Sequence, residues 1–150
     1  MDVRTEIGLD LPRSEVAAYV SDPDNATSWY ENIKSVEWKT SPPIAEGSRI
    51  AFAAEFLGKR IEYIYEVTAF EPGERLVMNA SAAPFPMETT YTWDDTPSGG
   101  TKMFLRNRGG PSGVLRFAAP LMALQVRRAN RRDLRRLKRI LEGGGSGQGL

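Results

Sequence analysis

The 150-residue sequence predicts an α+β domain in which a seven-stranded antiparallel sheet wraps around one long C-terminal helix. Residues 111–142 favour helix almost throughout and carry one apolar stripe. Before them come short segments in which polar and apolar side chains alternate, joined by short turns, as in an antiparallel meander. Such a sheet must bury one face, and the helix is the large apolar surface available to cover it.

The N-terminal segment is expected to form one strand followed by two short helices. Residues 2–9 alternate polar and apolar side chains, which predicts a half-buried strand that ends before Pro12. Residues 13–20 favour a short helix. The Asp-Pro-Asp sequence at 22–24 breaks that helix and starts a second one, which continues through Tyr30.

Six further strands are expected, separated by turn-forming residues. They cover residues 35–39, 49–56, 60–68, 76–80, 87–94 and 101–108. Pro42 and Pro43 follow the first of these strands, and Leu57 and Gly58 make a tip short enough for a hairpin turn. In the strand at 76–80 the pattern does not show which face is buried.

The C-terminal helix is expected to be amphipathic. At 100° per residue, one stripe collects Met122, Ala123, Val126, Asn130, Leu134, Leu137 and Leu141. The opposite face is basic and carries Arg127, Arg128, Arg131, Arg132, Arg135, Arg136, Lys138 and Arg139. Pro120 is expected to kink the helix or to separate a short first piece from a long second one. The domain should span residues 1–142, and residues 143–150 should form a flexible glycine-rich tail.

The composition excludes several kinds of active site. The chain has no cysteine and no histidine, so disulfides, Ser-His or Cys-His nucleophiles and His-ligated metal sites are ruled out. No metal or cofactor is expected. No segment is apolar for long enough to span a bilayer, and no signal peptide is evident, so a soluble cytoplasmic protein is expected.

The charge is small overall but unevenly distributed. The net charge is +1, yet residues 111–142 carry nine basic and two acidic side chains. A basic helix can meet nucleic acid or an anionic membrane surface. No aromatic residues interleave with the arginines, so nucleic acid binding is not expected. A solvated arginine face is the favoured interpretation, and peripheral membrane contact stays open.

The inner face of the predicted sheet is unusually polar for a dry core. Buried hydroxyl and amide groups need partners or cost about 1–3 kcal/mol each, so a converging set of them suggests a cavity that holds water or a ligand. The expected cavity residues are Thr5, Trp38, Phe52, Tyr63, Tyr65, Met78, Thr89, Tyr91, Met103, Asn107, Met122, Val126 and Asn130. Each tyrosine could equally be an ordinary core residue, and Asn130 could instead bond a neighbouring backbone group.

One end of the meander is predicted to be apolar. Every second turn of a meander lies at the same end of the sheet, and this set brings together Leu57, Phe85, Phe117 and Leu121 as a cavity mouth. Exposed apolar patches of this kind mark a ligand entrance, a membrane contact or a homodimer interface. They could also simply cap the core.

Several stretches resemble one superfamily. These are residues 20–30, 47–49, 65–76 and 90–93, together with the terminal helix. They are similar to the START-like (Bet v 1-like, SRPBCC) superfamily, and within it to the polyketide cyclase/dehydrase and lipid-transport group. The resemblance covers residues 1–142. It implies a helix-grip fold with a cavity between sheet and helix, in which relatives bind lipids, sterols, quinones, polyketides or hormones, and some catalyse cyclisation or dehydration.

Three functions are therefore weighed. The first is binding or carrying of a small hydrophobic ligand, with tyrosine and asparagine groups setting its orientation. The second is a cyclase, aromatase or dehydratase in which Tyr63, Tyr65 or Tyr91 acts as general acid. Here the charged strand residues fall mostly on the outer face, unlike those of catalytic relatives. The third is a module that contacts a membrane or a protein through the arginine-rich helix.

Overall fold

The structure is a computed structural model that describes residues 1–56, 58–81, 86–110 and 117–143. Its seven strands form one antiparallel sheet in the order β1-β7-β6-β5-β4-β3-β2, as the fold prediction requires. The strands are β1 (Asp2–Leu9), β2 (Ile33–Trp38), β3 (Arg49–Phe56), β4 (Lys59–Glu71), β5 (Arg75–Ala80), β6 (Met87–Asp95) and β7 (Thr101–Gly109). Strands β2 to β7 form a meander, and β1 pairs with β7 at the far edge.

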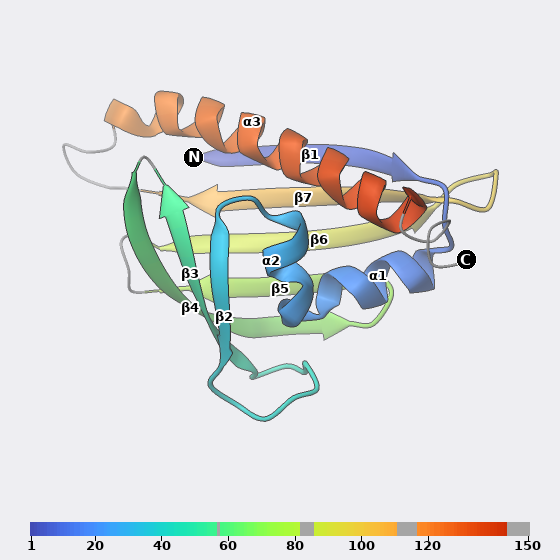
Figure 1. Cartoon of the computed structure of the whole chain (residues 1–150), viewed down its shortest axis with the longest axis horizontal. Coiled ribbons are helices and arrows are strands. Elements are labelled where there is room, and N and C mark those ends of the chain that lie inside the picture. Colours follow the sequence, from blue (N-terminus) through green and yellow to red (C-terminus); the bar gives the residue numbers. More distant parts are fainter. Residues whose placement is uncertain (57, 82–85, 111–116, 144–150) are drawn as a thin grey trace.

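The helices all lie on one side of the sheet. Helix α3 (Ala119–Lys138) runs along β1, while α1 (Arg13–Ser21) packs on β6 (Figure 1). Between β2 and α3 lies the short α2 (Ala26–Trp29), which follows a 3₁₀ turn, η1 (Pro23–Asn25). The second predicted helix is thus a 3₁₀ turn joined to an α turn, and the Asp22 carboxylate caps it by accepting a hydrogen bond from the Asp24 N–H at 3.0 Å.

Helix α3 begins at Ala119. Pro120 lies in its first turn, where a missing N–H costs no helical hydrogen bond, so the proline starts α3 and does not kink it. After Lys138 the chain continues as a π-helical segment, η3 (Arg139–Gly143). Residues 111–116, with the earlier part of the predicted helix, and residues 144–150 of the expected tail lie outside the described residues.

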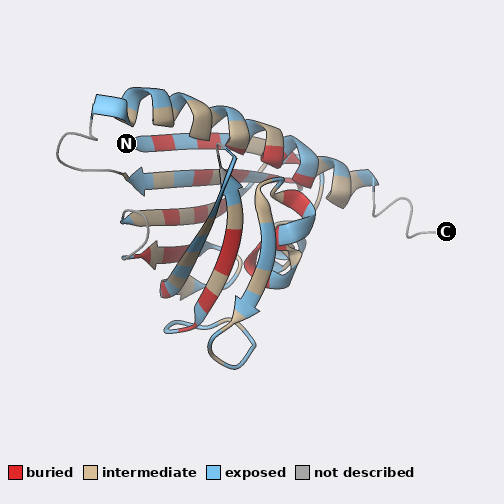
Figure 2. Ribbon diagram, turned by 60° about the vertical axis from the view of Figure 1, so that its left-hand side comes forward, coloured by how far each residue is buried: buried red, intermediate tan, exposed pale blue. Residues whose placement is uncertain are grey.

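The core lies between the inner face of the sheet and the helices (Figure 2). Along β1 burial alternates as the sequence predicts, with Val3 and Leu9 buried. From α3, Leu134 and Leu137 are fully buried, but Met122 and Val126, on the first half of the same stripe, are only half-buried. Helix α3 therefore packs against the sheet mainly through its second half.

Strand β5 explains why its faces could not be assigned. Leu76 and Met78 point to the core side, yet Val77 on the other side is buried as well. A register irregularity in the neighbouring strand β4, between Val67 and Ala69, interrupts the regular pairing here. With apolar residues on both faces, alternation carries no signal.

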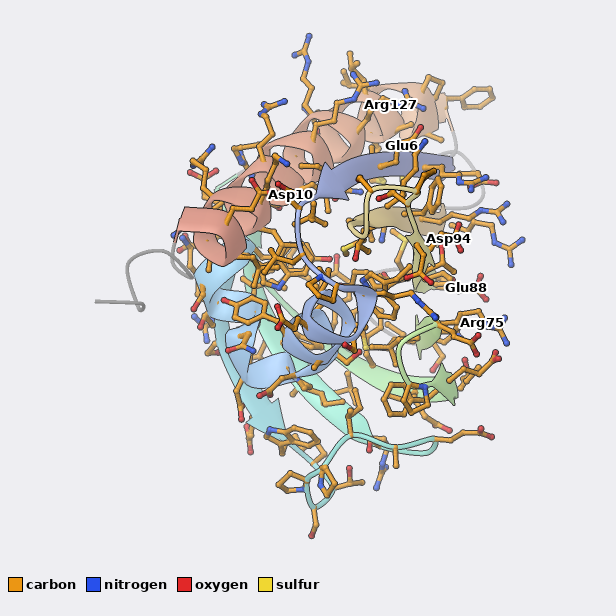
Figure 3. The ribbon with its side chains drawn as sticks, turned by 90° about the vertical axis from the view of Figure 1, so that its right-hand side faces the viewer. Glu6, Asp10, Arg75, Glu88, Asp94 and Arg127 are labelled. Carbon is orange, nitrogen blue, oxygen red and sulfur yellow. The ribbon has the colours of Figure 1, made fainter. Side chains whose placement is uncertain are left out.

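Charged strand residues lie on the outside of the sheet. Figure 3 shows Arg75, Glu88 and Asp94 on the side away from the helices. Cross-strand ion pairs join several such residues, including Arg106 with Asp2 at 2.7 Å. The predicted placement of charge on the outer face therefore agrees with the structure.

Candidate functional site

A cavity of about 140 Å³ lies between the inner face of the sheet, the N-terminal helices and α3. Its walls are Val20, Ser21, Pro23, Ala26, Trp29, Tyr30, Ile33, Ile44, Phe52, Ala54, Tyr63, Tyr65, Leu76, Met78, Thr89, Tyr91, Asn107 and Asn130. These described lining residues include no Asp, Glu, Lys or Arg. An engineered apolar cavity of about 150 Å³ holds benzene, so this space suits one aromatic ring.

Eight of the predicted cavity residues share this wall. They are Phe52, Tyr63, Tyr65, Met78, Thr89, Tyr91, Asn107 and Asn130. The period-two pattern therefore assigned the inward face of β3, β4, β6 and β7 as the structure has it.

The other five predicted residues lie elsewhere. The Thr5 hydroxyl donates to the Leu105 carbonyl at 3.4 Å, and the Trp38 indole N–H donates to Asp24 at 3.1 Å. Met103 is fully buried in the same packed cluster as Leu134 and Leu137. Met122 and Val126 are half-buried on the first half of α3, outside the lining. Alternation identifies a face, but not where along a strand that face meets packed side chains and where it meets open space.

The prediction missed the wall supplied by the N-terminal helices. Six lining residues come from this segment: Val20, Ser21, Pro23, Ala26, Trp29 and Tyr30. Elements of four to nine residues are too short to show a helical period. The aromatic pair directly after the Asp-Pro-Asp break is the one signal that could have indicated it.

A chain of side-chain hydrogen bonds crosses the cavity wall from α3 to β4. The Asn130 amide donates to the Asn107 carbonyl oxygen at 2.7 Å, and the Asn107 amide donates to the Thr89 hydroxyl at 2.9 Å. The Thr89 hydroxyl then donates to the Tyr65 hydroxyl at 3.4 Å. All four residues line the cavity, so their amides and hydroxyls form one connected network on its wall.

An aromatic group forms another part of the wall. The hydroxyls of Tyr30 and Tyr91 are hydrogen-bonded, and the Trp29 and Tyr30 ring centroids are 3.9 Å apart. The Trp29 ring meets Tyr91 edge-on at 6.1 Å. The Trp29 indole nitrogen and the Ser21 hydroxyl are buried without a hydrogen-bond partner among the described residues.

Burial keeps the cavity phenols in their neutral form. It raises the pKa of Tyr65 to about 12 and, together with the neighbouring phenol, raises the pKa of Tyr30 well above its ordinary value. Burial likewise raises the pKa of Tyr63 and Tyr91. With no Lys or Arg among the described lining residues to oppose this, the phenols act as neutral hydrogen-bond donors at physiological pH.

Asp133 is a buried charged residue that the sequence interpretation assigned no role. It is 2% exposed, and its carboxylate accepts from the Glu31 backbone N–H at 3.2 Å and from Arg132 at 3.4 Å. Burial raises the pKa of Asp133, while the Glu31 N–H and Arg132 act in the opposite direction. The carboxylate thus ties α3 to the segment that follows α2.

The basic face of α3 is consequently not uniformly solvated. Arg132 pairs with Glu31 at 2.6 Å in addition to Asp133. The Lys138 ammonium donates to the Gly8 carbonyl at 2.7 Å and to Glu142 at 2.8 Å. At these two positions the basic side chains are half-exposed, and acidic and carbonyl groups of neighbouring elements bond them.

A second, open hollow of about 670 Å³ lies beside the cavity. This side groove is lined by Ser14, Ala17, Ala18, Ser21, Asp22, Pro23, Asp24, Trp38, Pro42, Pro43, Ile44, Phe70, Pro72 and Gly73. Three residues, Ser21, Pro23 and Ile44, line both the side groove and the cavity. These three residues therefore form a shared part of the wall between the two spaces.

The predicted mouth is only partly within the described residues. Leu57 and Phe85 lie outside them. Phe117 and Leu121 are 76% and 61% exposed and do not line the cavity. Among the described helices, none is both long enough and apolar enough to cross a membrane. The described residues also hold no cluster of acidic side chains arranged to bind a metal ion.

Solved structures share this architecture. TTHA0849 from Thermus thermophilus is 17% identical with a TM-score of 0.80, over 95% of this chain and 99% of that one. A START superfamily protein from Mycobacterium smegmatis is 15% identical with a TM-score of 0.69, over 95% and 94% of the two chains. The Zhui aromatase/cyclase from a Streptomyces species is 12% identical with a TM-score of 0.75, over 94% and 95%. At these identities the likeness shows a common fold.

The sequence itself matches a family model. A search of curated proteins found no relative of this chain. The model described as polyketide cyclase / dehydrase and lipid transport matches residues 1–142, which is the extent of the resemblance noted in the sequence. The chain therefore belongs to the polyketide cyclase/dehydrase and lipid transport family.

Proposed function

We propose that this protein binds and carries a small, mainly apolar molecule in the cavity between sheet and helices. The observation that carries the proposal is the cavity wall, which is mostly aromatic and aliphatic, has no charged side chain among its described residues, and carries a connected set of amides and hydroxyls. Burial of apolar ligand surface would drive binding at about 25 cal/mol per Å². The family description, which includes lipid transport, supports the same reading.

The geometry favours binding over catalysis. A general acid works best when its pKa is near the operating pH, but burial raises the pKa of Tyr65 to about 12. The described wall has no cation that would lower it. A cyclase or aromatase activity, suggested by the names of structural neighbours such as the Zhui aromatase/cyclase, is thus the weaker candidate.

The volume limits the ligand. In this conformation about 140 Å³ admits a single ring or a short branched chain, well below the 300–1,000 Å³ of typical drug-sized sites. A polyketide or a lipid would require the wall to move. Cumene, a single ring with a branched alkyl group, is therefore a suitable first probe.

Two alanines on opposite faces of β3 provide the test. Ala54 lines the cavity, whereas Ala51 belongs to the outer face. We expect isothermal titration calorimetry to detect cumene binding to the wild type and to Ala51→Phe. Ala54→Phe fills the cavity and should weaken binding at least tenfold. Absence of binding to the wild type, or equal affinity for both variants, would contradict the proposal.

A second candidate function is peripheral contact with an anionic membrane. At the start of α3, Phe117, Leu121 and Leu124 are exposed, and the exposed arginines Arg128 and Arg131 follow on the same helix. Apolar side chains beside cations suit the surface of a bilayer that contains acidic lipids.

Liposome flotation tests this contact. We expect binding to phosphatidylserine vesicles that weakens steeply with salt and is lost in Leu121→Ser. Ile64→Ser is the matched control, because Ile64 is also an exposed apolar residue but lies on the outer face of the sheet. Equal binding by the two variants would argue against this candidate.

A further inference from the structure

The hydrogen-bond chain across the cavity wall has a direction. Each member donates to the next, from the Asn130 amide through Asn107 and Thr89 to the Tyr65 hydroxyl oxygen. The oxygen of Tyr65 is therefore already used as an acceptor, and its own hydrogen remains available. Within the described residues the Tyr65 hydroxyl makes no hydrogen bond besides the one from Thr89.

The surroundings of Tyr65 determine what can receive this hydrogen. Its ring meets Phe52 edge-on at 5.8 Å and Tyr63 at 5.9 Å, so the hydroxyl is carried on a rigid aromatic cluster. With a pKa of about 12, the hydroxyl keeps its proton at physiological pH and acts as a donor. A buried donor without a partner costs about 1–3 kcal/mol, which a suitable ligand would recover.

The absence of charge along the described wall excludes one class of acceptor. A carboxylate or phosphate entering this space would lose its hydration without meeting a Lys or Arg side chain. A neutral oxygen carries a much smaller desolvation cost. The acceptor is therefore expected to be uncharged.

On this basis, and resting on the proposed function, we infer that the ligand is an uncharged ring compound with a carbonyl or ether oxygen that accepts the Tyr65 hydroxyl. The ring occupies the aromatic and aliphatic part of the cavity, and the oxygen faces β4. Tyr65 is thus the residue that distinguishes oxygenated ligands from hydrocarbons of the same shape.

A matched pair of probes isolates this contact. Acetophenone and cumene have nearly the same shape, and only acetophenone carries a carbonyl oxygen. Tyr65→Phe removes one hydroxyl and keeps the ring. Tyr19→Phe is the matched control, because it removes a phenol hydroxyl from a residue that does not line the cavity.

We expect Tyr65→Phe to weaken acetophenone binding about tenfold in calorimetry while cumene affinity changes less than twofold. Tyr19→Phe should leave the affinity for both probes within twofold. If Tyr65→Phe weakens both probes equally, or neither, the inference is overturned while the proposed function stands. If the wild type binds neither probe, the proposed function fails and the inference fails with it.

A measurement on the wild type does not depend on how the variants fold. Acetophenone labelled with ¹³C at its carbonyl carbon should show a downfield shift when bound, relative to the same probe in cyclohexane. A bound carbonyl resonance at the hydrocarbon-solvent position would show that no hydrogen bond forms, and would overturn the inference.

Discussion

The hydroxyl oxygens of Tyr30 and Tyr91 lie 2.5 Å apart, and this hydrogen bond joins the end of the N-terminal helical segment to the middle of β6. Tyr91 is almost completely buried and pairs in the sheet with Leu76 and Leu105. Tyr30 stacks on Trp29, which is itself buried in the core. The bond therefore fixes the N-terminal wall of the cavity to the sheet, although the two residues are far apart in the chain.

Removal of either hydroxyl should destabilise the fold. We expect Tyr30→Phe and Tyr91→Phe each to lower the free energy of unfolding by about 0.5–1.5 kcal/mol, because each leaves the other hydroxyl without its partner. The double variant should cost less than the sum of the two, since both changes remove the same bond. Urea denaturation measures all three, and strict additivity would show that the hydroxyls do not interact.

Alkaline pH should destabilise the fold through the buried tyrosines. Tyrosines of the unfolded chain ionise near pH 10, whereas burial raises the pKa of Tyr65 to about 12 in the folded state. Above about pH 10 the unfolded state therefore binds fewer protons than the folded state, and stability falls as the pH rises. Each such tyrosine contributes about 1.4 kcal/mol per pH unit until the pH passes its folded pKa.

Tyr65→Phe provides the comparison for this effect. Between about pH 10 and pH 12 the free energy of unfolding of this variant should fall less steeply with pH than that of the wild type. The difference in slope should be about 1.4 kcal/mol per pH unit, the contribution of one tyrosine. Urea denaturation at several pH values measures both slopes. Parallel curves for the two proteins would mean that Tyr65 ionises in the folded state as readily as in the unfolded chain.

The buried carboxylate of Asp133 should leave a pH signature in the acid range. Because burial raises its pKa, the folded state holds the proton more tightly, and this part of the stability is lost as the pH rises through the folded pKa. Asp133→Asn keeps an acceptor for the Glu31 N–H and removes the charge. Its stability relative to the wild type should therefore increase between about pH 3 and pH 7.

Asp133→Ala separates the charge from the hydrogen bond. It removes the acceptor as well, and we expect it to be less stable than Asp133→Asn by about 0.5–1.5 kcal/mol across that range. Chemical denaturation of the three proteins at a series of pH values gives both comparisons. A difference between Asp133→Asn and the wild type that does not change with pH would contradict the raised pKa.

The two faces of α3 should respond differently to truncation. Leu137 is fully buried, so Leu137→Ala should cost about 2–5 kcal/mol through lost contacts and the cavity left behind. Arg136, its neighbour in sequence, is exposed, and Arg136→Ala should change stability by less than about 0.5 kcal/mol. Thermal or urea unfolding compares them directly, and similar losses would mean that the helix faces are assigned wrongly.

Patterns with a clear period could be predicted from the sequence. Leu134 and Leu137 stand out because apolar residues recur at helical spacing against arginines, and Val3 and Leu9 because a half-buried strand alternates. Asn130 was expected on the inner stripe, and the structure shows that its partner is Asn107, with the backbone alternative left unused. Periodicity predicts burial in these elements because one side of each is packed in the core and the other side is exposed to solvent.

Features that depend on a single distant partner could not be predicted. Asp133 is buried in α3, where its carboxylate accepts a hydrogen bond from the Glu31 N–H. The residues next to Asp133 in the sequence give no sign of this distant partner. Thr5 and Met103 point to the predicted face but pack against other residues. The alternation pattern shows which face a side chain is on, but not whether that part of the face borders a cavity. The wall supplied by Trp29 and Tyr30 belongs to turns too short to carry a period.

The side chains of Ser21, Pro23 and Ile44 line both the cavity and the side groove. A change in this shared wall can therefore alter the rate of ligand exchange without altering the affinity. A molecule that passes from the side groove inward would move these side chains, whereas the sheet and α3 would stay in place. Stopped-flow measurements should then show that Ile44→Ala speeds both uptake and release of cumene by similar factors. Unchanged exchange rates would place the passage elsewhere. If the rates do change together, the residence time of the guest is set at this shared wall, with no change in how tightly the pocket binds the guest.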